Sequence, residues 1–468
     1  MNTELNRLFI GGDLSGIQKF IYNISSKKAM VSLKGRSAYL NEFMNEIYCD
    51  ICKLPSVANS YMDRVYCSGG NFYLITENKQ EIKDELTAFR EKVEHDIWEK
   101  HHGQLALNMA WVPFGFVDKN NICTKHKEKT VLGDLWTLIN TEFSSMKYAK
   151  FKSVIVSHPE EFFNVTKVGK SPRVCAITGI ESEDCIDIED LCVLPTVAEH
   201  IVRGQMLRDK EGFKNLEEYA DGSYLAILRM DVDGLGKYFK ESLTSLEMYK
   251  TFSQKLDDFF DMEKGELHRI QQKYKDNMNI VYAGGDDIFA VGRWNVVLEF
   301  AADVRNEFVK FINRPGVTIS GGVAMVHPKY PIAKAAELAG NAEELAKGFN
   351  NGEKNAFTLF GIPISWKNEF IYVEEFKDKF VDMVKNYNLP KGLLFKIMQY
   401  GEMAKLDNQY DYIWHTVYYL SRAMERCGKE SPIYAFCKEL RDEQMIVPRK
   451  VVLLSVAARW AELLLRFQ

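Results

Sequence analysis

The chain repeats one pattern of strands, turns and helices, and this repeat limits its fold more than any other feature. The stretch LFIGGDLSGIQKF near the start resembles LAILRMDVDGLGKYF in the middle, and their apolar runs end at Asp13 and Asp231. The first glycine of a Gly-Gly pair follows 56 positions after Asp13, at Gly69, and 53 positions after Asp231, at Gly284. Two similar modules are the simplest explanation.

Each Gly-Gly pair lies between two apolar runs. The first stretch, Val65 to Thr76, reads VYCSGGNFYLIT, and the second, Val281 to Gly292, reads VYAGGDDIFAVG. An apolar run, two glycines and a second apolar run predict a tight hairpin between buried strands. Only the second hairpin carries a pair of aspartates, Asp286 and Asp287.

Both modules have the same predicted order of elements: strand, glycine turn, helix, hairpin, helix and strand. This β-α-β-β-α-β order is ferredoxin-like and predicts an α+β fold, with antiparallel sheets and helices on one face. In the first module, helices are predicted at residues 36–54 and 80–100 and a last strand from residue 105. In the second, helices are predicted at 244–275 and 295–312 and a last strand from 317.

The length of 468 residues favours about three domains at the usual size of roughly 100–200 residues each. We expect a first module over residues 1–117, a mixed middle region over 118–221, and a second module over 222–366. After residue 366 the apolar spacing, as in LLFKIMQYGEM, is helical and predicts a C-terminal helical bundle over 367–468.

Composition limits the possible partners. A net charge of -5 argues against a protein that holds nucleic acid alone by phosphate attraction, so any such role is local or shared. The basic segment from Ser25 to Ser37 is either a local patch or a solvated loop. The nine irregularly spaced cysteines favour reduced thiols and a cytoplasmic location. The first residues lack a signal-peptide pattern, and we expect no membrane span.

Three aspartates are the candidate catalytic residues. Adjacent strands lie about 4.8 Å apart, so the hairpin turn and the end of the neighbouring strand can meet, which brings Asp231, Asp286 and Asp287 together. Three carboxylates at close range repel unless cations lie between them, and oxygen ligands suit Mg²⁺ or Mn²⁺. We expect a metal site of Asp231, Val232, Asp286 and Asp287. Two such ions can activate a ribose 3′-hydroxyl for attack on an α-phosphate.

Glycine and lysine residues around these aspartates predict a nucleotide site. The turn after Asp231 offers backbone N–H groups to a triphosphate. Asp233 is either a third carboxylate or a turn residue, and the turn residue is favoured. A side chain on the hairpin glycines would block a nucleotide, and lysines near residue 350 are either phosphate ligands or solvated helix ends. The predicted nucleotide-binding residues are Gly234, Leu235, Gly236, Lys237, Gly284, Gly285, Lys347 and Lys354.

Together, these motifs resemble a known family. GDLSGIQKFIY, GGNF, MDVDGLGKYF, YAGGDDIF, SGGVAM and the AK…EKNA segment look like the large, polymerase-like subunit of type III CRISPR effector complexes, most like subtype III-A. The resemblance covers nearly the whole chain. It implies two palm domains, the first degenerate, and synthesis of cyclic oligoadenylates from ATP when target RNA binds. It also implies other subunits, guide RNA and target RNA as partners.

The resemblance assigns roles to single residues. Asp231, Asp286 and Asp287 would be metal ligands. Asn71 and Phe72 would stand at the places of Asp286 and Asp287, so the first palm would hold no metal pair and would position the acceptor nucleotide.

Two departures from the family pattern stand out. Members often begin with an HD nuclease domain, whereas here the only His-Asp pair, His95-Asp96, lies in the charged helix, and we expect no HD-type DNase activity. Members often carry a zinc site in the middle region, but the segment reads CAIT, with Thr178 in place of a second cysteine. A zinc site is the less favoured interpretation; its candidate ligands are Cys175, Cys185, Cys192 and His200.

Two other functions fit the same motifs. The GGDD-type turn also occurs in diguanylate cyclases, so a stand-alone nucleotide cyclase is one alternative. The other is a non-catalytic scaffold that holds the subunits of an RNA-guided complex.

Overall fold

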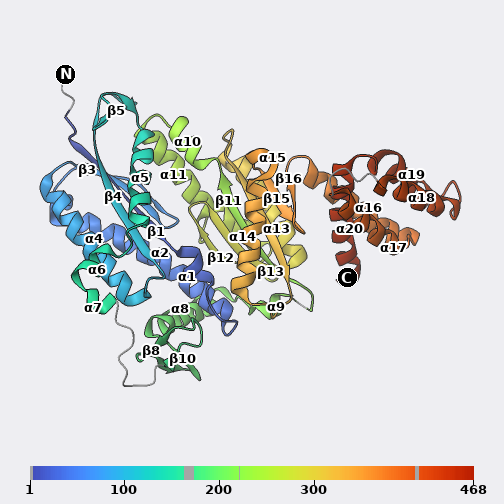
Figure 1. The fold of residues 1–468 in the computed structure, drawn as a ribbon, viewed down its shortest axis with the longest axis horizontal. Helices are drawn as coiled ribbons and strands as arrows, with labels where there is room; N and C mark the ends of the chain where they lie inside the picture. The colour runs from blue at the N-terminus through green and yellow to red at the C-terminus, as the bar shows by residue number, and fades with distance from the viewer. Residues whose placement is uncertain (1–3, 163–172, 221, 406–410, 468) are drawn as a thin grey trace. The chain divides into compact units, whose positions relative to one another are not determined.

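The computed structural model describes residues 4–162, 173–220, 222–405 and 411–467. It forms two compact units (Figure 1). The first unit comprises residues 1–319 and 325–339, and the second comprises 320–324 and 340–468. The mixed helix and sheet composition and the helical C-terminal part agree with the predicted fold class. The finer division into four domains stays a prediction.

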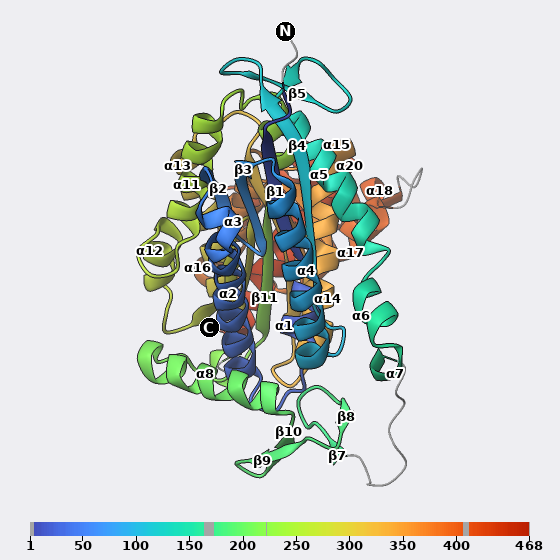
Figure 2. The ribbon, with the colours of Figure 1, turned by 90° about the vertical axis from the view of Figure 1, so that its left-hand side faces the viewer.

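The first sheet has the strand order β2-β3-β1-β4-β5-β6. β1 lies between β3 and β4 and is antiparallel to both. Helices α2 and α4 lie over one face, which is toward the viewer in Figure 2, and α5 packs against the other face through Ile139 and Phe143, which adjoin Gly11 of β1. The strands are β1 (Arg7–Ser15), β2 (Met62–Ser68), β3 (Asn71–Glu77), β4 (Ala106–Phe116), β5 (Asn121–Thr124) and β6 (Thr130–Val131), and the helices are α1 (Ile17–Tyr22), α2 (Ala29–Lys53), α3 (Pro55–Ala58), α4 (Gln80–His101) and α5 (Asp134–Lys147).

The second module repeats this arrangement. Its strand order β12-β13-β11-β14 matches β2-β3-β1-β4 of the first. Both predicted hairpins and the predicted order of elements are confirmed. The elements are β11 (Leu225–Asp233), α10 (Leu235–Glu241), α11 (Leu246–Phe260), α12 (Glu266–Gln272), β12 (Met278–Gly284), β13 (Asp287–Arg293), α13 (Trp294–Ile312) and β14 (Thr318–Val326).

Each module packs one of its helices against the sheet of the other module. α2 of the first module packs against β12 of the second, and α11 of the second packs against β2 of the first. Lys34 of α2 donates to the carbonyl of Ile280 at 3.2 Å, and Lys250 of α11 forms an ion pair with Asp63 of β2. This reciprocal packing places the two hairpins next to one another.

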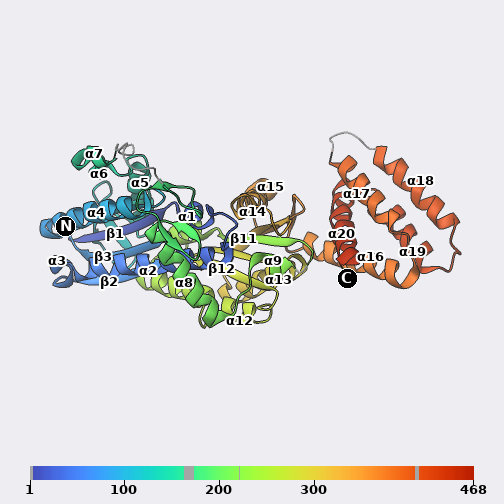
Figure 3. The same ribbon diagram turned by 90° about the horizontal axis from the view of Figure 1, so that it is seen from below.

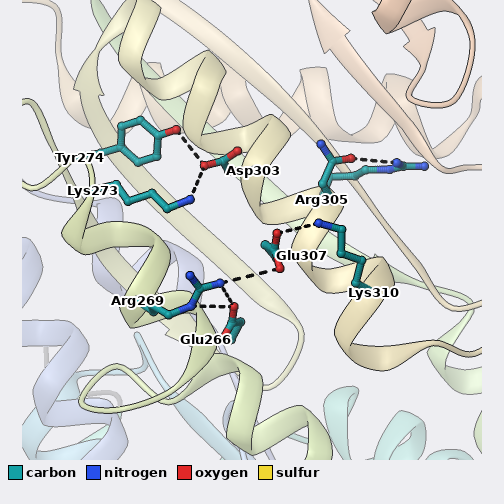
Figure 4. A network of polar contacts seen from close by, with 9 residues as sticks. Glu266, Arg269, Lys273, Tyr274, Asp303, Arg305, Glu307 and Lys310 are labelled. Atoms are coloured by element: carbon teal, nitrogen blue, oxygen red, sulfur yellow. Dashed lines mark hydrogen bonds and ion pairs between the residues drawn. The ribbon is translucent and has the colours of Figure 1, made fainter.

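Polar side chains join α12 and α13 of the second module on the solvent side (Figure 4). Asp303 accepts from the hydroxyl of Tyr274 at 2.9 Å and pairs with Lys273 at 3.1 Å. Arg269 of α12 pairs with Glu307 of α13 at 3.8 Å, and Glu307 also pairs with Lys310 of its own helix at 2.9 Å. Exposed ion pairs of this kind are worth about 0–1 kcal/mol each, so the network supports the helices without dominating their stability.

The segment after the first sheet contains short strands and helices. Helix α8 crosses α2 at close range because both have glycine at the crossing: a Cβ on Gly35 would lie 1.8 Å from the carbonyl oxygen of His200, and one on Gly204 would lie 2.0 Å from that of Val31. The elements are α6 (Lys152–Ser157), α7 (Pro159–Phe162), β7 (Arg173–Val174), β8 (Glu181–Ser182), β9 (Ile186–Ile188), β10 (Leu191–Val193), α8 (Pro195–Glu211) and α9 (Leu216–Ala220).

The basic segment from Ser25 to Ser37 is a loop only at its start, where residues 25–28 precede α2 and Lys27 is exposed. Much of this segment belongs to α2, where Lys34 is 7% exposed and Arg36 is 1% exposed. Lys34 pairs with Glu211 at 2.8 Å, and Arg36 donates to the carbonyl of Phe20. Both cations therefore serve the packing of α2 and are not a surface for phosphates.

The second unit ends in a group of helices (Figure 3). Its β15 pairs in parallel with β14 and in antiparallel with β16. Within the described ranges, no helix is apolar over a long enough stretch to cross a membrane. The elements are α14 (Ile332–Lys347), α15 (Phe349–Gly352), β15 (Ala356–Leu359), β16 (Ile362–Ser365), α16 (Glu369–Tyr387), α17 (Gly392–Ala404), α18 (Asp411–Glu425), α19 (Pro432–Glu439), the π-helical turn Leu440–Gln444 and α20 (Pro448–Phe467).

Candidate active site

The two hairpins have two-residue turns with different backbone requirements. In the first, Gly69 and Gly70 are the central residues, with φ of 61° and 83°. In the second, the central residues are Gly285, with φ of 66°, and Asp286, which is not in the positive-φ region. A turn of type I′ needs positive φ at both positions, whereas type II′ needs it only at the first. The second turn therefore admits a carboxylate where the first requires glycine.

The strand register corrects the predicted match between the hairpins. Alignment on the first glycine placed Asn71 and Phe72 at the positions of Asp286 and Asp287. In the sheets, the aspartate of β1 pairs with Asn71, and the first aspartate of β11 pairs with Asp287. Asn71 therefore matches Asp287, and Gly70 matches Asp286.

A backbone hydrogen bond in each module supports this correction. The N–H of Leu14 donates to the carbonyl of Gly70 at 2.9 Å, and the N–H of Val232 donates to the carbonyl of Asp286 at 3.1 Å. The prediction was wrong by one residue because the Gly-Gly pairs occupy different positions of the two turns. The conclusion drawn from it holds, since neither Gly70 nor Asn71 carries a carboxylate.

The turns of the two hairpins touch. A Cβ on Gly69 would lie 2.6 Å from the Cα of Gly285, and a Cβ on Gly285 would lie 3.0 Å from the Cα of Gly69. A Cβ on Gly284 would lie 2.8 Å from the hydroxyl of Tyr282. Contact between the backbones thus explains Gly69 and Gly285, and the Tyr282 side chain explains Gly284. The predicted role of Gly284 and Gly285 beneath a nucleotide stays a prediction.

The structure brings the three predicted aspartates together. Asp231 pairs with Asp287 across the sheet, and Asp286 occupies the adjoining turn. One carboxylate oxygen from each lies within 4.8 Å of the others, and all three residues are half-buried. Three carboxylates this close are a donor set that suits a hard divalent cation such as Mg²⁺ or Mn²⁺. Val232 lies beside them as predicted, and its part in metal binding stays a prediction.

Neutral polar groups surround the carboxylates. Burial raises the pKa of Tyr66 and of Tyr282, and the negative charge of Asp286 raises both further. Both phenols therefore remain protonated at neutral pH. Gln18, from α1 of the first module, donates to a carboxylate oxygen of Asp287 at 3.5 Å.

A pocket of about 570 Å³ adjoins Asp286. Both modules and α5 contribute to it, and one aromatic wall is Trp136, which stacks on Tyr249 with ring centroids 4.1 Å apart and 7° between the planes. Sequence reasoning missed this wall because it assigned α5 to a separate middle region. The lining residues are Tyr66, Asn71, Tyr73, Trp136, Thr137, Asn140, Thr141, Ser144, Leu235, Gly236, Phe239, Lys240, Leu256 and Asp286.

The predicted phosphate turn borders the same pocket. Gly234 precedes α10 with φ of 72°, and a Cβ there would lie 2.2 Å from the carbonyl oxygen of Gly316. Leu235 and Gly236 line the pocket, whereas Lys237 is exposed. Lys240, one turn further along, lines the pocket and was not predicted. The assignment of these residues to phosphate binding stays a prediction.

Asp233 is buried and hydrogen-bonded within the second sheet. It is 2% exposed and accepts from the hydroxyl of Thr318 at 2.8 Å. This is a buried contact at the end of β11 with β14. The interpretation of Asp233 as a turn residue, and not as a further metal-binding carboxylate, stays a prediction.

The two predicted phosphate lysines belong to the second unit. Lys347 pairs with Glu343 at 2.8 Å, and Lys354 has a left-handed backbone with φ of 59°. Their role toward phosphates stays a prediction.

The middle-region cysteines do not form a cluster with His200. In the described part of the chain, the groups of three or more metal-ligand side chains contain none of Cys175, Cys185, Cys192 and His200. His200 is instead packed between aromatic rings, including that of Phe20 at 5.5 Å, and burial lowers its pKa to about 3. Burial, and then the neighbouring thiols of Cys192 and Cys175, raise the pKa of Cys185 to about 11, so the three cysteines lie near one another without His200. The less favoured zinc site stays a prediction.

Two family models match the modules described above. Residues 6–167 match the model of Csm1 subunit domain B, and residues 224–358 match that of the second palm domain of Cas10/Cmr2. Together the matches cover more than half of the chain. The chain belongs to the Cas10/Csm1 family.

Curated relatives in this family are single-strand-specific deoxyribonucleases of the CRISPR system, Cas10/Csm1 of subtype III-A. The protein of Enterococcus italicus is 27% identical over 421 residues, which cover 75% of this chain and 54% of the relative. That of Streptococcus thermophilus is 23% identical over 488 residues, which cover 89% of this chain and 62% of the relative. The chain thus spans little more than half the length of these relatives.

Solved structures of the family share the fold. The apo Csm1-Csm4 cassette matches with a TM-score of 0.66 and 20% identity over 97% of this chain and 70% of that chain. The same cassette in complex with cA4 matches with a TM-score of 0.66 and 19% identity, again over 97% and 70%. Likeness at this level of identity is evidence for the fold.

Proposed function

We propose that the chain converts ATP to cyclic oligoadenylates by metal-dependent nucleotidyl transfer, as the large subunit of a type III CRISPR complex that has bound target RNA. One observation carries this proposal. Asp231, Asp286 and Asp287 converge where two similar modules meet, beside a pocket that both modules line. Two nucleotides at such a junction can act as donor and acceptor, which a linked oligonucleotide requires.

The carboxylates fit a pair of divalent cations. Mg²⁺ or Mn²⁺, when bound, lowers the pKa of the attacking 3′-hydroxyl and offsets the charge of the leaving pyrophosphate. Asp231, Asp286 and Asp287 would hold these ions. The three residues lie on a strand, a turn and a second strand of one sheet, so their separation is fixed by backbone pairing.

The other residues bind and orient the nucleotides. Trp136 offers an apolar surface that suits a base and is supported by its stacking on the buried Tyr249, and Lys240 supplies a positive charge to phosphates. Gly285 and Gly69 keep the two turns in contact, which maintains the position of Asp286. No histidine lines the described pocket, and none is required because bound cations activate the hydroxyl.

The first module would position the acceptor nucleotide. Its one aspartate in the matching place, Asp13, pairs with Lys147 at 2.9 Å and accepts from Asn108 at 3.2 Å. A lysine thus already balances this charge, and the absence of partner carboxylates at Gly70 and Asn71 removes the need for a metal.

The ligands bound to solved relatives support this function. Csm1-Csm4 cassettes have been solved in complex with cA4, with cA3, with AMPPNP and with one ATP. We extend these ligand classes to the present chain, together with a Csm4-like subunit, guide RNA and target RNA as partners. We also keep a cytoplasmic location and the lack of HD-type DNase activity as predictions.

Product analysis tests the proposal. The complex is incubated with ATP and Mn²⁺ or Mg²⁺, with and without target RNA, and products are identified by mass spectrometry. Cyclic oligoadenylates that depend on target RNA are expected. Product from GTP alone would favour a diguanylate-type cyclase.

A double variant, Asp286→Ala with Asp287→Ala, separates the enzyme from a scaffold. An enzyme should lose the product and still assemble with its partners. Unchanged product in this variant would exclude these carboxylates from catalysis.

A further inference from the structure

A second cluster of metal-ligand side chains lies on the first module, outside the proposed active site. His95, Asp96 and His158 border a pocket of about 790 Å³ between α4, the start of β4, the end of α5, and α6, and Glu99 lies one turn after His95 on α4. This pocket shares no lining residue with the pocket beside Asp286. Sequence analysis noted only His95 and Asp96 here and assigned them no function.

Three of the ligand groups come from one helix. His95 and Glu99 are four residues apart, so they lie on the same face of α4. The Nδ1 of His95 is 3.8 Å from Oε2 of Glu99. One ligand atom from each of His95, Asp96 and Glu99 lies within 4.8 Å of the others. Little movement is needed for these atoms to share one ion.

The fourth ligand group comes from a different segment. His158, which follows α6, has its ring centroid 4.9 Å from that of His95, with the two planes tilted by 60°. The hydroxyl of Ser157 lies 2.9 Å from Nδ1 of His158, which leaves Nε2 as the nitrogen for coordination. A hydrogen bond on the second nitrogen is the usual support of a metal-binding imidazole.

The donor types indicate the kind of ion. Two imidazoles with carboxylates are ligands for Zn²⁺ and for neighbouring transition metals, whereas Mg²⁺ prefers oxygen ligands alone. Cationic side chains, including Arg90, Lys92, Lys150 and Lys152, also line the pocket. They oppose binding that depends on charge alone, so coordinate bonds from the two histidines must provide the affinity.

We propose that His95, Asp96, Glu99 and His158 form a binding site for a single transition-metal ion of the Zn²⁺ class, which joins α4 to the segment after α6. The ion links residues 95 and 158, which are far apart in sequence. Binding to the folded state raises stability, by an amount that grows with the logarithm of the ion concentration above the Kd. The site shares no residue with the proposed catalytic carboxylates, so the two proposals can be tested separately.

Cobalt binding tests this site, because Co²⁺ is a coloured substitute for Zn²⁺. Untagged full-length chain is stripped with a chelator and titrated with Co²⁺. The expected result is one Co²⁺ per chain that remains bound in excess Mg²⁺, with visible absorption of nitrogen and oxygen ligation. Zn²⁺ should displace this ion, and a large excess of Mg²⁺ should not. Zn²⁺ should also raise the melting temperature of the stripped chain.

Variants identify the ligands. His95→Ala and His158→Ala should each weaken Co²⁺ binding at least tenfold and remove the melting shift, and Glu99→Gln should weaken binding less. His126→Ala, at an exposed loop histidine, should change neither measurement. Asp286→Ala with Asp287→Ala should also leave the coloured site intact, which separates this inference from the proposed function.

Three outcomes would overturn the proposal. The first is that no Co²⁺ binds above the level of the chelator blank. The second is that folded His95→Ala and His158→Ala chains bind Co²⁺ as tightly as the unaltered chain. The third is an absorption band of thiolate ligation that Cys185→Ser removes. Circular dichroism of each variant shows that it is folded. A variant that fails to fold is replaced by His95→Gln or His158→Gln.

Discussion

The two hairpins share a backbone plan and differ in what their turns permit. The first turn has positive φ at Gly69 and Gly70, and the second only at Gly285. The one position freed from glycine is the position of Asp286. A difference in turn type, and not only a change of side chain, therefore separates the module that gathers carboxylates from the module that does not.

The aspartates on the first strand of each module also differ in their neighbours. Asp231 lies among other carboxylates, whereas Asp13 lies beside a lysine and an asparagine amide. The comparison teaches that a duplicated module can keep one acidic residue and place it beside a cation in place of further carboxylates. The experiments below test the comparison, from the largest expected effect to the smallest.

Exchange of the matched residues should have the largest effect. Asp287→Asn gives the second hairpin the residue that the first has in the same register, and it removes one of three carboxylates. We expect product formation from ATP to fall by roughly 10²-fold or more, comparable to the loss of one preorganised electrostatic group. Rate measurement on the assembled complex checks this.

The reciprocal change is the control. Asn71→Asp adds a carboxylate to the first hairpin without its partner at Gly70, and it should neither restore nor double activity. Equal losses in both variants would show that the hairpins are not functionally distinct.

The contact between the turns should matter next. Gly69→Ala introduces a Cβ 2.6 Å from the Cα of Gly285 at a residue with φ of 61°. Steric overlap and left-handed strain together should cost about 2–5 kcal/mol of unfolding free energy. Urea denaturation measures this.

A glycine without neighbours isolates the strain. Gly179 has φ of 73°, and a Cβ added there would meet nothing within 4 Å. Gly179→Ala should therefore cost only about 1–2 kcal/mol. Similar costs at both positions would mean that the two turns do not press on one another.

A buried carboxyl on the other side of the two turns should make stability depend on pH, with a smaller effect. A pocket of about 320 Å³ there contains Asp257 of α11, and burial raises the pKa of this carboxyl to about 6. The folded state then holds a proton that the unfolded state has lost, so stability falls as pH rises from about 4 to 6 and is constant above.

Substitution of Asp257 removes this penalty. Asp257→Asn should raise the unfolding free energy by about 1–2 kcal/mol at pH 7.5 and leave it unchanged near pH 4, after allowance for partial exposure. Asp258→Asn, at the exposed neighbour, should show little pH dependence. Melting curves across this pH range decide the matter, and a uniform shift at all pH values would refute it.

The smallest effect is expected at the ion pair of the first module. Lys147→Ala breaks the contact with Asp13, but Lys147 is 49% exposed, so the loss of stability should be about 0.5 kcal/mol or less. Mn²⁺ binding should not increase, because a single carboxylate is a weak site. A second bound Mn²⁺ would show that the lysine alone suppresses metal binding.

Local patterns predicted most of the fold. Alternating and continuous apolar runs predicted both hairpins, and the charged stretch from residue 80 predicted α4, because these periods depend only on which faces are buried. The apolar strand before Asp231 and the hairpin at Asp286 were enough to predict that the carboxylates converge, since strand pairing has fixed spacing.

Other features depended on contacts between distant segments. The basic stretch around Lys34 and Arg36 gave no sign of burial, because the carbonyl and carboxylate partners of these cations lie elsewhere in the chain. The wall formed by Trp136 was missed for a similar reason, since α5 follows the first module in sequence and packs back onto it.

The sequence by itself determined two modules, two hairpins and an acidic triad, because periodicity and turn chemistry act within a few residues. Only the tertiary structure decided which turn residues correspond, that Gly69 touches Gly285, and that His158 lies beside His95. These features depend on how separate elements pack, and packing is set by shape and burial over the whole unit and not by neighbours along the chain.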